Sequence, residues 1–271
     1  MLSVRDLTVA GRHSDLVPRT SFEARRGELL LVRADGQGHR TALALAAAGR
    51  LAPTDGTAAW GSHSGKPVRD LKGLRRVGAF VDAPAINEAE LHLRVKDLVA
   101  EDLALLPRRH RGPGKPDAWL TVNAFADIAD SWAQDLPAAR RTELLTALAL
   151  ANPETELLVL DSPDRHSDDP ADWLPFLAGT AARGGRPLAV VAVVATFPEH
   201  WAGPAAVVGN SIRRLAAQGD LAARPGDLGA PRGDVAARPG DLGAPQGDVA
   251  ATPGDLAATR GDLALGEGVR A

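Results

Sequence analysis

Residues 27–51 read GELLLVRADGQGHRTALALAAAGRL and join an apolar run, a glycine-containing turn and a run rich in Ala and Leu. The apolar run at 28–32 predicts a buried strand, and Gly36 and Gly38 predict a turn over 34–38. Residues 41–51 predict a helix that ends before Pro53. This order of strand, glycine turn and helix is typical of an α/β domain that binds phosphate at a helix N-terminus.

Short apolar runs on both sides of this stretch extend the α/β pattern. Strands are expected at 2–9, 57–60, 77–81, 157–160 and 188–195, and helices at 91–106, 118–132 and from Pro137 onward. Asp135 is placed to cap the last of these helices. The run 107–116, rich in Pro, Gly and basic residues, predicts a loop.

The last fifth of the 271 residues has a different composition. From Gly219 to Glu267 a seven-residue unit that begins Gly-Asp repeats, and residues 219–271 carry the whole net charge of −3, so that 1–218 is neutral. Recurrent Gly and Pro exclude a coiled coil, because both destabilise helices. One Leu or Val in each unit cannot offset the entropy of ordering the segment, so 219–271 is predicted to be a disordered tail.

Composition excludes several classes of function. The chain has no cysteine, which rules out disulfide scaffolds, thiolate metal sites and cysteine nucleophiles. Its neutral body argues against nucleic-acid binding. The longest apolar run, 187–197, is shorter than the roughly 20 residues of a spanning helix, and the N-terminus does not read as an export signal. We therefore expect no membrane insertion, and a cytoplasmic location or a peripheral one at the inner face of the membrane.

The order of motifs across 1–218 resembles the nucleotide-binding subunit of an ABC transporter. The matching stretches are LSVRDLTVAG, SFEARRGELLLVRADGQGHRTALALAAAGRLAPTDGTAAWG, VGAFVDAP, LHLRVKDLVAED, DLPAARRTELLTALALANPETELLVLDSPD and VVATFPEH. The resemblance implies a P-loop NTPase fold with a RecA-like core, a small antiparallel β subdomain and a helical insertion near 83–134. It also implies an ATP-hydrolysing family with a membrane permease as partner.

The family's phosphate loop reads G-x-x-G-x-G-K-[ST]-T, and residues 33–41 stand in its place. His39 replaces the lysine that reaches the phosphates, and Arg40 replaces the hydroxyl that binds Mg²⁺. Two alternatives remain: Arg40 contacts a phosphate without metal, or the segment is a glycine turn without a ligand. The candidate nucleotide-binding residues are Asp35, Gly36, Gln37, Gly38, His39, Arg40 and Thr41.

Catalytic positions of the family are replaced as well. Asp161 keeps the acidic position at the end of LLVLDSP, but Ser162 follows where the resemblance places the general-base glutamate. A hydroxyl accepts no proton at neutral pH, so a rate contribution of roughly 10²–10⁴ is expected to be missing. Phe197 stands in place of the histidine that contacts the γ-phosphate. Asp82 replaces the glutamine that links Mg²⁺ to the helical subdomain, so Asp161 and Asp82 are the candidate metal ligands.

The family's signature LSGGQ is replaced by Leu136, Pro137, Ala138, Ala139 and Arg140. Pro137 has no N–H to offer to a phosphate, and alanines stand where the family has glycines. In the family, each site combines one chain's phosphate loop with the signature of the other. Both halves of a composite site are therefore altered in this chain.

The replacements predict a subunit with weak or no ATP hydrolysis that binds a permease, a partner ATPase or a second copy of the chain, and that senses nucleotide. ATP is retained as a candidate ligand and Mg²⁺ is disfavoured. The alternatives are an active ATPase with atypical motifs and an interaction scaffold without a transport role. His166, Asp168 and Asp169, and the basic run 108–111, are interpreted as solvated loops.

Overall fold

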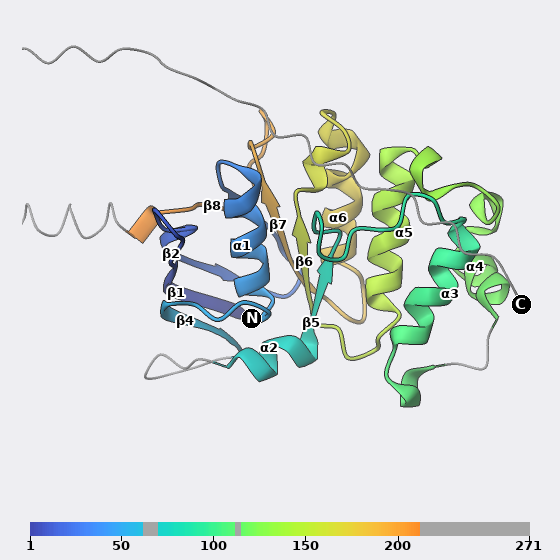
Figure 1. Cartoon of the computed structure of the whole chain (residues 1–271), viewed down its shortest axis with the longest axis horizontal. Helices are drawn as coiled ribbons and strands as arrows, with labels where there is room; N and C mark the ends of the chain where they lie inside the picture. The colour runs from blue at the N-terminus through green and yellow to red at the C-terminus, as the bar shows by residue number, and fades with distance from the viewer. Residues whose placement is uncertain (62–69, 112–114, 212–271) are drawn as a thin grey trace, which may run out of the picture. The chain divides into compact units, whose positions relative to one another are not determined.

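The computed structural model describes residues 1–61, 70–111 and 115–211 (Figure 1). The repeats from Gly219 onward, predicted to be disordered, lie outside the described residues. The strands are β1 (Leu2–Val9), β2 (Val17–Ala24), β3 (Leu29–Arg33), β4 (Asp55–Trp60), β5 (Gly78–Val81), β6 (Leu157–Asp161), β7 (Ala189–Val194) and β8 (Ala205–Val207). The helices are α1 (Gln37–Ala47), α2 (Leu71–Val77), α3 (Val95–Leu105), α4 (Pro116–Val122), α5 (Ala138–Leu150) and α6 (Leu174–Ala181).

The core is a parallel sheet with the strand order β5-β6-β7-β3-β8. Every residue of β6 and β7 is buried, as expected for strands that helices cover on both faces. Side chains alternate between the faces: Val159 and Val191 pack with α1, whereas Leu160 and Val190 pack with α5 and α6. Figure 1 shows α1 on one side of this sheet and α5 and α6 on the other.

A second, antiparallel sheet with the order β2-β1-β4 lies on the α1 side of the core. Its inward residues, among them Leu2, Val4 and Val17, pack with Ala44 and Leu43 of α1 in the same hydrophobic core. Within the described part of 83–134, α3, α4 and short 3₁₀ turns form the expected helical insertion. The predicted α/β class is therefore confirmed.

Several element boundaries differ from the sequence pattern. Helix α1 begins at Gln37, α3 begins at Val95, and the stretch predicted as one helix over 118–132 contains α4 followed by turns. The prediction that Asp135 caps α5 is wrong, because Asp135 lies in a 3₁₀ turn and the N-cap of α5 is Pro137 without a side-chain bond. The sequence pattern did not single out β2, which contains Pro18, and it did not single out α2, α6 or β8. These elements are short, and α6 contains Pro175 and Gly179.

Helix α1 ends earlier than expected because of Gly49. This residue adopts φ 71°, and the N–H groups of Gly49 and Arg50 donate to the carbonyls of Ala46 and Leu45 at 3.1 and 2.8 Å. These are the two hydrogen bonds of a Schellman motif, which stops a helix at a left-handed residue. The turn after α1 is joined to α2 by Arg75, whose Nη1 donates to the Gly49 carbonyl at 2.9 Å.

A Gly49→Ala variant is expected to lose about 1–3 kcal/mol of unfolding free energy, since alanine is strained at this φ. Its Cβ would also lie 2.7 Å from the Cβ of Leu74 and 2.8 Å from the carbonyl oxygen of Leu71. Urea unfolding followed by circular dichroism measures the loss. The control is Gly179→Ala in α6, where a Cβ meets nothing within 4 Å and stability should stay constant or rise. Equal stability of both variants would contradict the packing of this turn.

No helix among the described residues has the length and apolar character needed to span a bilayer.

Candidate functional site

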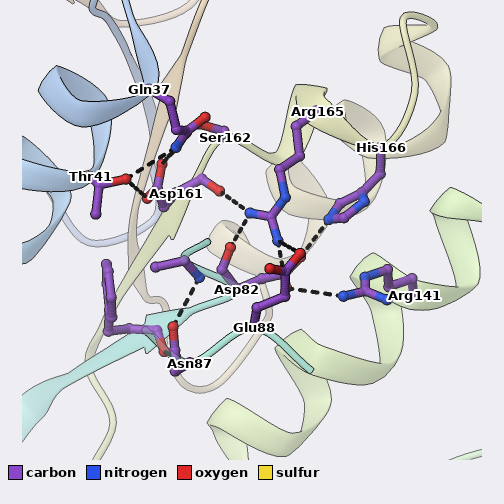
Figure 2. A network of polar contacts seen from close by, with 12 residues as sticks. Gln37, Thr41, Asp82, Asn87, Glu88, Arg141, Asp161, Ser162, Arg165 and His166 are labelled. Carbon is purple, nitrogen blue, oxygen red and sulfur yellow. Dashed lines mark hydrogen bonds and ion pairs between the residues drawn. The ribbon is translucent and has the colours of Figure 1, made fainter. Parts of the chain in front are cut away.

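The candidate nucleotide-binding residues lie in the turn between β3 and α1. Gly36 is the N-cap of α1 and has φ 73°, a backbone conformation that favours glycine. Gln37 and Thr41 are one turn apart on α1, and both point toward the end of β6, as Figure 2 shows. The fold thus brings the phosphate-loop position and Asp161 together.

Asp161 is the centre of a hydrogen-bond network, although only 1% of the residue is exposed. Thr41 Oγ1 donates to its Oδ2 at 2.5 Å. Gln37 Nε2 and Ser162 Oγ donate to its Oδ1 at 3.0 and 2.8 Å (Figure 2). Side chains of the protein itself therefore satisfy both oxygens of the carboxylate.

The Arg40 side chain extends this network without contacting Asp161 directly. Its Nε donates to Ser162 Oγ at 2.8 Å, its Nη2 donates to Gln37 Oε1 at 2.8 Å, and its Nη1 donates to the Ala34 carbonyl at 3.3 Å. The guanidinium thus binds two of the three side chains that donate to Asp161. Its positive charge lies where the family resemblance places the hydroxyl ligand of a cation.

The residues present do not fit a Mg²⁺ ion. Mg²⁺ needs oxygen ligands with free lone pairs in near-octahedral geometry. Asp161 already accepts three hydrogen bonds, and Arg40 brings a cation beside it. In the described ranges, no cluster of three or more His, Cys, Asp or Glu residues could hold a metal ion.

Asp82, the second candidate metal ligand, is held by two arginine side chains and one histidine side chain. Its carboxylate lies 3.0 Å from Arg165 Nη2, 3.4 Å from Arg141 Nη2 and 2.7 Å from His166 Nε2 (Figure 2). Burial raises the pKa of this carboxyl, but the hydrogen bond to His166 and the charges of Arg165 and Arg141 outweigh burial and lower its pKa. The carboxylate of Asp82 is therefore engaged by side chains of the protein itself and is not free to bind a metal ion.

The polar segment after β6 differs in part from its interpretation as a solvated loop. Asp168 and Asp169 are exposed, as expected. The His166 side chain is only 20% exposed, because it contacts Asp82. Arg165 and Arg141 complete this cluster, and no local motif in the sequence marks either residue.

The signature position at the start of α5 contacts the helical insertion. Pro137 precedes the first turn of the helix without a side-chain cap. Arg140 donates to Asp127 and Glu143, each at 2.8 Å, and its guanidinium lies 4.8 Å from the centre of the Phe125 ring. Arg140 is thus engaged by groups of its own chain.

Two further positions lack the chemistry of the family. Phe197 packs against the hydrophobic core beside α6, and the Arg33 guanidinium lies 5.7 Å from the centre of its ring. Ser162 adopts the left-handed conformation with φ 54°, and its N–H donates to the Val193 carbonyl at 2.8 Å. The serine hydroxyl donates to Asp161 and accepts from Arg40, which leaves it no role as a general base.

The basic run 108–111 is largely exposed, as expected, although two of its side chains contact Glu154. Arg109 forms an ion pair with Glu154, and His110 Nε2 lies 3.0 Å from the same carboxylate. The hydrogen bonds to His110 and then to Arg109 lower the pKa of Glu154 to about 2. Arg111 Nε donates to the Leu106 carbonyl at 2.7 Å. These side chains fix the turn after α3 to the segment that precedes β6.

Comparison with known proteins places the fold. No protein-family model and no curated protein matches the sequence. A structure of cbiO1 from Clostridium perfringens, part of the ABC transporter complex cbiONQ, is similar at 17% identity and a TM-score of 0.52, covering 72% of this chain and 78% of that chain. The ATP-binding cassette MJ0796, in a dimeric post-hydrolysis structure with ADP and Pi, is similar at 16% identity and a TM-score of 0.51, covering 72% and 88%.

A third similar structure is a putative ABC transporter ATP-binding protein from Pyrococcus furiosus, at 14% identity and a TM-score of 0.53, covering 77% of this chain and 98% of that chain. At identities this low, structural likeness establishes the fold and leaves the activity open. The parallel sheet, the antiparallel subdomain and the helical insertion all agree with it. The chain has the fold of an ABC transporter ATP-binding cassette.

Proposed function

We propose that the chain is an ABC-type subunit that hydrolyses ATP weakly or not at all, and that acts by binding a membrane permease or a partner ATPase. The observation that carries this proposal is the closed network around Asp161. The carboxylate of Asp161 accepts hydrogen bonds from Gln37, Thr41 and Ser162. Arg40 stands at the position where the family has a metal-binding hydroxyl, and it donates to Ser162.

Phosphoryl transfer to water needs an oriented nucleophile and cations that neutralise developing charge on the phosphate. Ser162 is a hydrogen-bond donor to Asp161 and supplies no base. Phe197 offers no hydrogen bond to a phosphate. Arg140, at the signature position, is held by Asp127 and Glu143. A general base, a side-chain contact to the γ-phosphate from position 197 and a free signature residue are therefore missing from this chain's own residues.

Nucleotide sensing is the second part of the proposal. The N-terminus of α1 directs backbone N–H groups toward the turn at Gly36, an arrangement that favours an anion. Arg40 and His39 lie in the first turn of this helix. Phosphate bound there would compete with Ser162 and Gln37 for the Arg40 guanidinium, and the network would open without a metal.

Partner binding draws support from the similar proteins and from exposed apolar residues. The cbiO1 protein is part of a transporter complex, and MJ0796 forms a dimer. In this chain Ile86, Leu91 and Trp132 are large apolar side chains with 40–53% exposure, in the segments before α3 and α5. The backbone N–H of Gln134 donates to the Leu91 carbonyl, so these two segments lie side by side. They offer an apolar surface on the helical insertion.

The test is ATP binding and turnover by the full-length chain. ATP affinity, measured by calorimetry, is expected to be equal with Mg²⁺ and with EDTA. Steady-state hydrolysis is expected to equal that of an Asp161→Asn variant. Turnover that exceeds background and vanishes in the variant would overturn the proposal, and undetectable ATP binding would remove the sensing role.

A Ser162→Glu variant serves as the matched control, because it restores the general base of the family alone. Hydrolysis is expected to stay at background, since Arg40 and the signature position remain replaced. A gain comparable to the roughly 10²–10⁴-fold effect of a general base would show that the rest of the site is competent. The transport role is tested by the neighbouring genes: an adjacent gene that encodes several spans of about 20 apolar residues, and whose product co-purifies with this chain, would support it.

A further inference from the structure

A largely buried cluster of polar and charged side chains meets at the loop after β5, and the proposed function does not use it. Asp82 lies where the chain passes from the core sheet to the helical insertion, and Arg165 and His166 follow β6. Arg141 lies in the first turn of α5. Figure 2 shows these side chains converging from three parts of the chain. Their exposed fractions are only 7% for Arg141, 12% for Asp82, 16% for Arg165 and 20% for His166.

Arg165 binds two loops of the core at once. Its Nη1 donates to the main-chain carbonyl of Asp82 and, at 3.2 Å, to that of Asp161. Its Nη2 contacts the carboxylates of Asp82 and Glu88, each at 3.0 Å. One guanidinium therefore joins the end of β5, the end of β6 and the segment that leads into α3.

Asn87 fixes the shape of the loop that presents Asp82. Its side-chain oxygen accepts from the Ala83 N–H at 2.9 Å, and its amide donates to the Phe80 carbonyl at 2.7 Å (Figure 2). Asp82 and Ala85 both have positive φ, 56° and 58°. Such a backbone persists only where surrounding contacts hold it, so the loop is ordered by these bonds.

We propose that this cluster is a lock that keeps the helical insertion and α5 in one orientation on the core sheet, whatever occupies the phosphate loop. Asp82 takes ion pairs from α5 and from the segment after β6, so motion of α5 away from β5 would leave buried charges without partners. Arg165 is the positioning residue of the lock. The inference does not rest on the loss of ATP hydrolysis, since it concerns ion pairs between elements, and it confines the effect of a bound phosphate to the network around Asp161.

The experiment uses spin labels on the full-length chain, whose lack of cysteine allows clean labelling. Val122→Cys on α4, where the native side chain is 85% exposed, reports on the helical insertion, and Lys72→Cys at an exposed position of α2 reports on the core. Double electron–electron resonance is expected to give one narrow distance distribution that stays constant when ATP and Mg²⁺ are added. A shift on addition of ATP and Mg²⁺ would overturn the lock.

An Arg165→Ala change in the labelled protein is expected to broaden the distribution and add a second distance. The control is Arg186→Ala, which likewise removes a guanidinium bound to two main-chain carbonyls, those of Pro153 and Thr155, and should leave the distribution narrow. Equal broadening by both variants, or none by Arg165→Ala, would overturn the proposal.

Arg165→Lys decides the question where the alanine variant does not fold. Lysine keeps the charge near Asp82 but cannot donate to two carbonyls and two carboxylates in a fixed plane. The spin-label distance distribution of the Arg165→Lys variant is expected to be broader than that of the wild type. Where Arg165→Ala folds, the lysine variant's distribution is expected to be narrower than that of the alanine variant. A lysine variant as narrow as the wild type would contradict the role of Arg165.

Discussion

An Asp161→Ala variant is expected to be less stable than the wild type by about 3 kcal/mol or more, because hydrogen bonds to a charged group contribute about 1.5–3 kcal/mol each. Three such bonds, from Gln37, Thr41 and Ser162, meet at this carboxylate. For a domain of this size the loss corresponds to a fall in Tm of about 6–12 °C. Differential scanning calorimetry without nucleotide or metal measures it.

The loss of stability in Asp161→Ala distinguishes a carboxylate held by its own protein's hydrogen bonds from one that is kept free for catalysis. Active sites commonly hold strained or repelling groups, so that replacing a catalytic residue often leaves stability unchanged or raises it. In this chain the carboxylate is instead a structural acceptor that ties α1 to β6. Asp35→Ala, on an exposed residue of the same loop, is the control, and its stability should change by no more than about 0.5 kcal/mol. An Asp161→Ala protein as stable as this control would contradict the closed network.

Most of the strands and the positions of the motifs could be predicted from the sequence because they depend on local pattern, but β2 and β8 were not predicted. The continuous apolar runs 157–160 and 188–195 became β6 and β7, since strands buried on both faces need no polar alternation. The phosphate loop was recognisable from its glycines and its place between a strand and a helix. Elements of three to eight residues, such as β8 and α6, were missed because so short a run has no clear periodicity.

The partners of the replaced residues could not be predicted. The sequence showed that Arg40 replaces a hydroxyl, but a long side chain has many rotamers, and its partner Ser162 is 122 residues away. Likewise, the sequence showed Asp82 in place of a glutamine, while its contacts with Arg165 and His166 span more than 80 residues. Such pairings depend on how the ends of β5 and β6 meet in the sheet, which no single motif encodes.

Asp82→Asn is expected to lower the free energy of unfolding at pH 7 by about 3–5 kcal/mol, the usual cost of removing one partner from a buried ion pair. The change leaves Arg141 and Arg165 with less than 20% exposure and without the carboxylate between them. Urea unfolding of the full-length chain measures the difference. Asp127→Asn, which removes the exposed partner of Arg140, is the control and should cost about 0–1 kcal/mol.

The wild type and Asp82→Asn should differ less in unfolding free energy at acid pH. The pKa of Asp82 is lower in the folded chain than its ordinary value, so its contribution is complete above the unfolded-state pKa of about 3.9 and is lost as the pH falls through the folded-state pKa. The stability gap between the wild type and Asp82→Asn should therefore narrow as the pH drops below about 4. A gap that stays constant down to the acid transition would show that the cluster of Arg141, Arg165 and His166 does not hold the ionised form of this carboxylate, and that other contacts keep α5 on the sheet.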